Sequence, residues 1–168
     1  MTSDPLAGYV SPLATRNASP EMQAIWSPRR KFGLWRRIWL ALAEAEQDLG
    51  LPITNDQLDE LRTHLDPTNE ELENAATHES RLRHDVMAHV HALGDVAPAA
   101  RPIIHLGATS QFINCNTEII LLRDALTMVA IKTARVIDAL ATFAAQWRDT
   151  PTLAFTHYQP AQPTTVGR

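Results

Sequence analysis

The stretch Ile119–Trp147, IILLRDALTMVAIKTARVIDALATFAAQW, decides the fold of this 168-residue chain. Its apolar residues recur at alternating spacings of three and four, which is typical of a helix that packs lengthwise against other helices. The pattern predicts one helix from about Asn116 to Arg148, about 50 Å long at a rise of roughly 1.5 Å per residue. The seam positions are Ile119, Leu122, Leu126, Val129, Thr133, Val136, Leu140, Phe143 and Trp147.

A second stripe of small and apolar residues runs beside this seam. A helix that is apolar over so wide a face has to be covered on more than one side. No other segment of the chain is long enough to cover it, so we expect the cover to come from further sequence or from other copies of the chain. The second stripe consists of Ile120, Ala130, Ala134, Ile137, Ala141 and Ala144.

Local signals upstream of the seam predict shorter helices. Ser19-Pro20 and Ser27-Pro28 each place a capping hydroxyl before a proline in the first helical turn. The helix that starts at Pro28 is expected to end at Gly50, and Thr54 to Gln57 has the pattern of a capping box. These segments predict an all-α fold, in which a small N-terminal helical domain is followed by the first long helix of a central helical bundle.

The chain divides into three parts on this interpretation. Residues 1–18 mix Pro, Gly, Ser, Thr and Asn without periodicity and are expected to form an arm. Residues 19–100 form the N-terminal helical domain, and residues 101–168 begin the bundle domain. No β-hairpin signal is found, and Pro163–Arg168 is expected to begin a helix. We therefore interpret the chain as the front part of a longer enzyme.

Composition indicates a soluble globular protein. Apolar residues make up 45% and charged residues 20% of the chain, and the formal net charge is −4. The longest basic run is Arg29-Arg30-Lys31, which argues against a nucleic-acid-binding surface. Neither a signal peptide nor a membrane span is found. A single cysteine, Cys115, excludes an internal disulfide, is expected to be a packed thiol, and favours a cytoplasmic location.

Polar residues gather on both sides of the long helix. After it, His157 lies in a segment that Pro151 and Pro160 mark as a shaped loop. An imidazole titrates near neutral pH, so His157 can transfer a proton in a reaction; the alternative is a histidine that binds loop backbone. Before the helix, Thr109 and Ser110 could bind a carboxylate or phosphate, or could merely cap the helix.

A third polar cluster is Arg83-His84-Asp85. Arg83 could bind an anion through its forked guanidinium, and Asp85 could hold the imidazole in one tautomer. The alternative is a solvated helix cap. His89 and His91 are two residues apart on a predicted helix and point to different faces, and no zinc motif is present, so no metal is expected.

Five stretches dispersed over most of the chain form a joint pattern: SPEM (Ser19–Met22), LAEAEQDLGLPIT (Leu42–Thr54), RLRHDVMAHVH (Arg81–His91), IHLGATS (Ile104–Ser110) and THYQPAQPTTVGR (Thr156–Arg168). Together they resemble the adenylosuccinate lyase family of the fumarase/aspartase superfamily. The resemblance implies elimination of fumarate from adenylosuccinate, giving AMP, and from succinylaminoimidazole carboxamide ribotide, in purine nucleotide biosynthesis. It implies no cofactor.

The resemblance also implies residue roles. His157 matches the general acid that protonates the departing nitrogen, and Arg83, His84, Asp85, Thr109 and Ser110 match substrate-binding groups. Arg16 matches an arginine that binds the nucleotide phosphate, with Asn17 standing where relatives commonly have tyrosine. Cys115 stands where an aspartate is common. The serine base of the family is expected on a loop beyond Arg168.

Assembly is expected from the same reasoning. Thr109 and His157 are predicted at opposite ends of the long helix, so a shared pocket requires more than one chain. The resemblance implies a homotetramer whose sites draw on three chains and which acts on small succinyl nucleotides, with no nucleic-acid or membrane partner. Two alternatives remain: another lyase of the superfamily, for argininosuccinate or aspartate, or a non-catalytic helical oligomerisation module.

Overall fold

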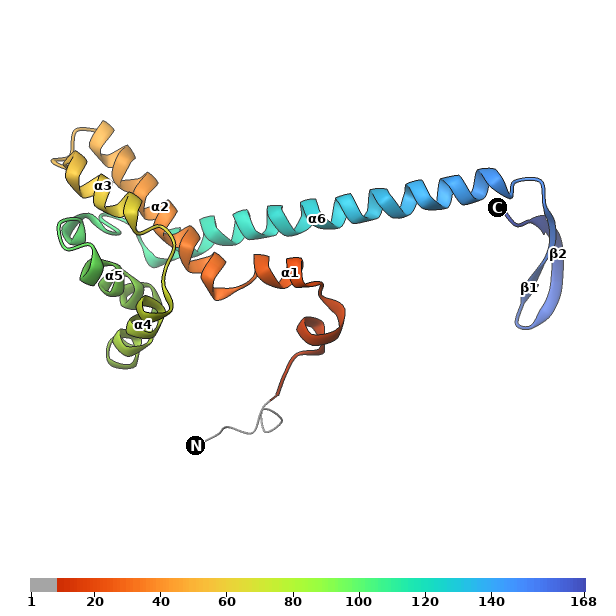
Figure 1. Cartoon of the computed structure of the whole chain (residues 1–168), viewed down its shortest axis with the longest axis horizontal. Helices are drawn as coiled ribbons and strands as arrows, with labels where there is room; N and C mark the ends of the chain where they lie inside the picture. The colour runs from red at the N-terminus through yellow and green to blue at the C-terminus, as the bar shows by residue number, and fades with distance from the viewer. Residues whose placement is uncertain (1–8) are drawn as a thin grey trace. The chain divides into compact units, whose positions relative to one another are not determined.

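The computed structural model describes residues 9–168, in which helices predominate (Figure 1). The chain divides into two compact units, the first extending to Ala125 and the second spanning Leu126–Arg168. The predicted fold class is confirmed, although a short two-stranded sheet is also present. The elements are η1 (Leu13–Asn17, a π-helical turn), α1 (Pro20–Ile25), α2 (Pro28–Asp48), α3 (Asn55–Thr63), α4 (Asn69–Leu82), α5 (Asp85–Val96), η2 (Arg101–Ile103, 3-10), α6 (Ser110–Gln146), β1 (Pro151–Thr156) and β2 (Gln159–Thr165).

The helices of the first unit begin where their capping residues predict. The side chain of Ser27 accepts a hydrogen bond from the Arg30 N–H and caps α2. Thr54 and Gln57 form the predicted capping box of α3, and Thr68 forms another at the start of α4. Each cap satisfies backbone donors that a helix start leaves without partners. Of the predicted arm, residues 1–8 lie outside the described part of the chain.

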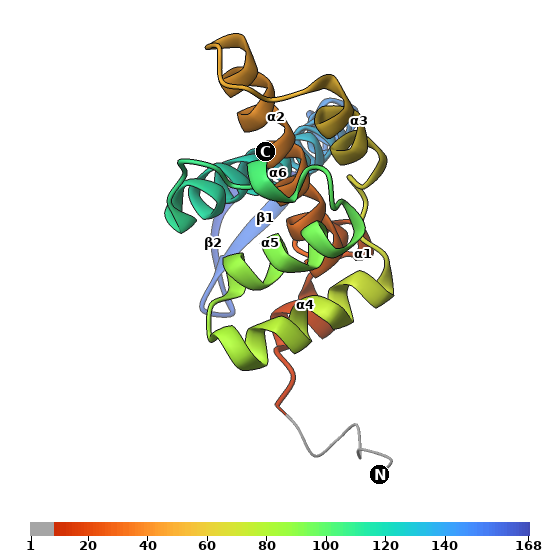
Figure 2. The same ribbon diagram turned by 90° about the vertical axis from the view of Figure 1, so that its left-hand side faces the viewer.

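The core of the first unit is built around α2. Trp35 and Trp39 of this helix are buried and pack with Leu61 of α3, Leu93 of α5 and Ile113 at the start of α6. Helices α4 and α5 lie side by side in both views of the molecule (Figures 1 and 2). The core cluster therefore joins α2, α3, α5 and the start of α6.

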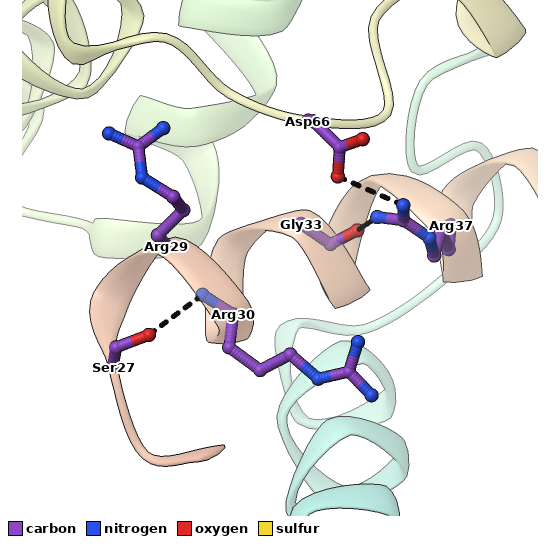
Figure 3. Close-up of a pocket in the computed structure, with 6 residues that line it drawn as sticks. All are labelled: Ser27, Arg29, Arg30, Gly33, Arg37 and Asp66. Atoms are coloured by element: carbon purple, nitrogen blue, oxygen red, sulfur yellow. Dashed lines mark hydrogen bonds and ion pairs between the residues drawn. The ribbon is translucent and has the colours of Figure 1, made fainter. Parts of the chain in front are cut away.

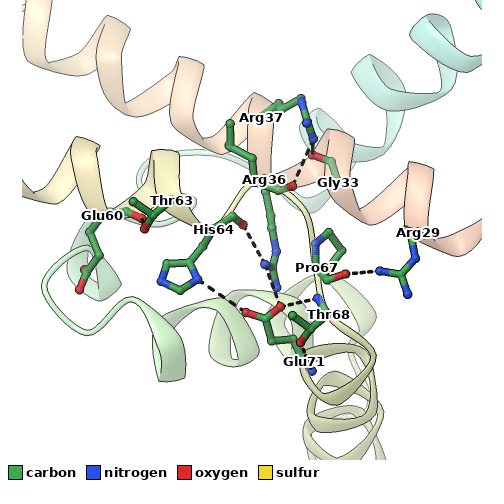
Figure 4. A network of polar contacts seen from close by, with 11 residues as sticks. Arg29, Gly33, Arg36, Arg37, Glu60, Thr63, His64, Pro67, Thr68 and Glu71 are labelled. Carbon is green, nitrogen blue, oxygen red and sulfur yellow. Dashed lines mark hydrogen bonds and ion pairs between the residues drawn. The ribbon is translucent and has the colours of Figure 1, made fainter.

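A buried ion pair fastens α2 to the connection between α3 and α4 (Figure 4). The Arg36 guanidinium, only 4% exposed, donates to the His64 carbonyl at 2.8 Å and lies 3.4 Å from the Glu71 carboxylate. Burial alone would raise the pKa of Glu71, but the bond from the Thr68 N–H and the charge of Arg36 lower it. The pair is thus satisfied on both sides, as a buried charge requires.

Helix α6 begins six residues before the predicted start. It opens at Ser110 rather than near Asn116, so Cys115 lies inside the helix. The thiol is exposed and accepts a hydrogen bond from Gln111 at 2.9 Å, so the expectation of a packed thiol is wrong. The reason is helical spacing: Ile113 and Thr117 take the buried face, and Cys115 falls between them on the other side.

The predicted seam of α6 is left uncovered by the described chain. Its apolar members are between 40% and 66% exposed, with Trp147 and Ile119 at the two extremes. Within residues 9–168, no helix combines the length and apolar character needed to cross a membrane.

The C-terminal segment is a β-hairpin, which corrects two predictions. β1 pairs with β2 in antiparallel register, so Pro163–Arg168 does not begin a helix. The β-branched threonines at both ends of the strands favour extended backbone, and the prolines are tolerated because each strand is an edge. The hairpin turn is His157-Tyr158, with positive φ at both residues, and it lacks the glycine or asparagine that usually signals such a turn.

Candidate functional site

The turn between α4 and α5 carries three of the predicted site residues. Arg83 ends α4 in a left-handed conformation, with φ of 55°, and its N–H donates to the Glu79 carbonyl. His84 is the N-cap of α5, and Asp85 is the first residue of that helix. All three side chains are exposed, so they are free to meet a ligand.

His84 joins this turn to the start of α6. Its Nδ1 accepts a hydrogen bond from the Met87 N–H at 3.3 Å, and its Nε2 lies 3.1 Å from the Ser110 hydroxyl. Because Nδ1 is an acceptor, the neutral ring carries its proton on Nε2 and donates it to Ser110. The structure thus brings together His84 and Ser110, which are 26 residues apart in sequence.

Asp85 does not hold the His84 ring in the way considered from the sequence. Its carboxylate accepts a hydrogen bond from the Val86 N–H at 2.8 Å and lies 3.8 Å from Nδ1 of His84, which is too long for a hydrogen bond. Met87 and Ser110 orient the ring instead. Asp85 remains an exposed carboxylate beside it.

His105 is a site residue that sequence reasoning did not select. It has a φ of 63°, and its Nδ1 accepts a hydrogen bond from the Trp39 indole at 3.1 Å. Burial and, to a smaller extent, the nearby His84 lower the pKa of His105. The neutral ring therefore presents an Nε2 donor. Its only sequence signal was its place in the stretch that includes Thr109 and Ser110.

Two imidazoles, a hydroxyl and the Asp85 carboxylate lie in this part of the first unit. The imidazole donors lie near the N-terminal end of the 37-residue helix α6, where unpaired N–H groups favour negative charge. Thr109 is exposed immediately before this end. An arrangement of this kind can bind a carboxylate or phosphate and can stabilise negative charge that develops during a reaction.

His157 lies in the second unit, at the tip of the hairpin. His157 and Tyr158 have φ of 49° and 61°, and both side chains are exposed. Arg16 and Asn17 are exposed residues of η1, in the first unit. Within the first unit, the structure therefore brings together the 83–85 turn and Ser110, and no hydrogen bond among its described residues joins Arg16 or Asn17 to them.

Left-handed backbone marks the predicted site segments. Among residues 9–168, the non-glycine residues with positive φ are Arg83, His105, His157 and Tyr158. Such conformations are costly for residues with a Cβ and collect at functional sites. All four belong to the stretches that carry the family resemblance.

Arg29 and Arg30 of the basic run, with Arg37 two turns later on α2, line a different pocket, of about 240 Å³ (Figure 3). Its guanidinium groups already have protein partners: Arg29 donates to Pro67, Arg37 pairs with Asp66 at 2.9 Å, and Arg30 pairs with Asp124 at 3.0 Å. The run thus ties α2 to neighbouring segments.

The two histidines considered for metal binding have different neighbours. His89 stacks on Phe32 with ring centroids 3.7 Å apart, and burial, followed by the charge of Arg36, lowers its pKa to about 4. His91 stacks on His78 instead, at 5.4 Å. In the described part of the chain, no three histidine, cysteine or acidic side chains are arranged to hold a metal ion.

Curated relatives named adenylosuccinate lyase match nearly the whole chain. The protein from Saccharomyces cerevisiae is 47% identical over 161 residues and that from Schizosaccharomyces pombe is 48% identical over 161 residues. Each match covers 95% of this chain and 33% of the relative, so the chain spans about a third of the length of these relatives. No family model matches the chain.

Solved structures of the superfamily share the fold. A fumarate lyase from Mesorhizobium sp. BNC1 has 28% sequence identity and a TM-score of 0.78, covering 89% of this chain and 35% of that one. Together with the curated relatives, this structure confirms the resemblance predicted from the sequence.

Proposed function

We propose that the full-length protein is an adenylosuccinate lyase. It eliminates fumarate from adenylosuccinate to give AMP, and from succinylaminoimidazole carboxamide ribotide, in purine nucleotide biosynthesis. The observation that carries this proposal is the identity of 47–48% to curated relatives of that name over 95% of the chain. The hydrogen-bonding groups of His84 and Ser110 support it, because the substrates carry carboxylates and a phosphate.

The chemistry requires an acid, a base and fixed donors. Removal of a proton beside a carboxylate leaves a carbanion whose charge spreads into that carboxylate, where donors stabilise it. We assign substrate binding to Arg83, His84, Asp85, Thr109 and Ser110. His105, which presents its Nε2 donor beside His84, joins this set.

The remaining roles follow the resemblance. His157 is the general acid that protonates the departing nitrogen, and its exposure at a hairpin tip makes it available to a ligand or another chain. Arg16, with Asn17 beside it, binds the nucleotide phosphate. The base is a serine on sequence that follows Arg168.

We also propose that the protein is a cytoplasmic homotetramer with sites drawn from three chains. The support is the apolar seam of α6, which the described residues leave 40–66% exposed and which is suited to helix–helix packing between copies. On the same reasoning, residues 19–100 form an N-terminal domain and residues 101–168 begin the shared bundle.

Fumarate release by the purified full-length protein tests the activity. We expect release from both succinyl nucleotides and none from argininosuccinate or aspartate. Release of fumarate from argininosuccinate alone would show that the protein is another lyase of the superfamily and not an adenylosuccinate lyase. A stable oligomer that releases fumarate from none of the four compounds would favour the oligomerisation module.

Light scattering tests the assembly. We expect the mass of four chains for the full-length protein at micromolar concentration. An active monomer in dilute solution would contradict both the tetramer and the shared site.

A further inference from the structure

Helix α2 touches the loop that leads into α6 at two points on one face. The first is the hydrogen bond from Trp39 to His105. The second is Glu46, seven residues or about two helical turns later. A Cβ built on Gly107 would lie only 3.6 Å from Oε1 of Glu46, so the carboxyl group lies close beside the loop backbone.

The Glu46 side chain is only partly buried, but one of its carboxyl oxygens is enclosed. Oε2 is buried, and no hydrogen-bond partner for it is present among the described residues. Burial raises the pKa of Glu46. A buried polar atom without a partner is destabilising. We therefore look for a function of this carboxyl group that packing alone does not explain.

The neighbouring loop is locally strained at His105, a non-glycine residue in a left-handed conformation, whereas Gly107 adopts its positive φ without strain. His105 has a φ of 63° and Gly107 a φ of 65°. Leu106 and Ala108 each donate only a long backbone bond of 3.4 Å within the loop. The backbone conformation at Gly107 sets where Thr109 and Ser110 leave the loop and enter α6.

We propose that Glu46 is a positioning residue that holds the 105–110 loop at Gly107 and so aims His105, Thr109 and Ser110 at the ligand. Oε1 lies beside Gly107, and Oε2, which has no partner among the described residues, can accept a hydrogen bond from a loop amide as the loop moves. The role rests on the proposed lyase function, because the ligand is the succinyl nucleotide.

Two substitutions in the full-length protein test the role. Glu46→Gln keeps a hydrogen-bonding group of the same shape, and we expect kcat/KM within about threefold of wild type. Glu46→Leu keeps the bulk without the hydrogen bond, and we expect kcat/KM to fall by about 10- to 100-fold, as misplaced groups commonly cost. Glu44→Leu, two residues earlier on the same helix where Glu44 pairs with Arg62, is the matched control.

Amide hydrogen exchange of residues 105–108 separates this role from activity. We expect faster exchange in Glu46→Leu than in wild type, with Glu46→Gln and Glu44→Leu unchanged and all variants folded by thermal denaturation. Equal kcat/KM in the Leu and Gln variants, or unchanged loop exchange in Glu46→Leu, would overturn the proposal. If wild type releases no fumarate, the lyase function fails and the exchange comparison alone decides the role.

Discussion

The two halves of α6 differ in burial although they form one helix. Up to Ala125, one residue in every four is buried against the first unit, at Ile113, Thr117, Leu121 and Ala125. From Leu126 onward, none of the helix residues is buried, although Val129, Val136 and Leu140 are large and apolar. Apolar periodicity therefore predicts that one face of a helix packs against another surface. It does not say which segment or chain provides that surface.

The largest expected effect is on turnover, from a change at His157 in the hairpin that follows α6. His157→Ala in the full-length protein should lower kcat by about 100- to 10,000-fold, because a general acid contributes on this scale. The mass in light scattering should stay unchanged. Tyr158→Ala, at the other residue of the same hairpin turn, is the matched control and should lose far less activity. Unaltered turnover in His157→Ala would remove this histidine from the mechanism.

The two halves of α6 can be compared directly by truncating one apolar side chain in each. Ile113→Ala should cost about 2–4 kcal/mol in the free energy of unfolding of the 168-residue chain, because the residue is fully buried. Val129→Ala, at a residue that is 49% exposed, should cost less than about 1 kcal/mol in the same chain. Urea denaturation measures both. Equal costs would mean that the second half is covered within one chain.

A smaller effect concerns the pH dependence of stability, through the partly buried His89 of the first unit. His89 has a pKa lowered to about 4, whereas the unfolded chain takes up this proton near pH 6.5. The unfolded state therefore binds more protons between these values, and stability falls as the pH drops from about 6.5 to 4. The loss attributable to His89 is at most about 3 kcal/mol.

His89→Phe preserves stacking on Phe32 and removes the titration. We expect this variant to lose less stability than wild type between pH 7 and pH 4, as measured by urea denaturation at several pH values. Parallel pH curves for the two proteins would show that His89 is not the group responsible.

Local signals predicted much of the fold. The capping side chains of Ser27 and Thr54 bond to residues three positions later, so adjacent sequence is enough to predict where these helices begin. The hairpin was missed because its turn, His157-Tyr158, uses left-handed residues without glycine or asparagine, and because pairing depends on both strands at once. The start of α6 at Ser110 was missed because the seam begins later.

The residues of the candidate site that lie at predicted helix ends could be selected from the sequence. Arg83, His84 and Ser110 stand out as polar groups at predicted helix ends. The contacts that involve Trp39 and Glu46 could not be predicted in the same way. The bond from Trp39 to His105 joins residues 66 positions apart, and such pairings depend on how α2 packs beneath the loop.

The division of α6 also has a consequence for synthesis of the protein. Every residue of the large apolar core cluster, from Trp35 to Ile113, precedes Ala125 in the chain. The residues of this core therefore emerge from the ribosome before the uncovered half of the helix does. If the proposed assembly is correct, that half stays exposed until copies associate, and chaperones that shield exposed apolar helices should matter most during this interval.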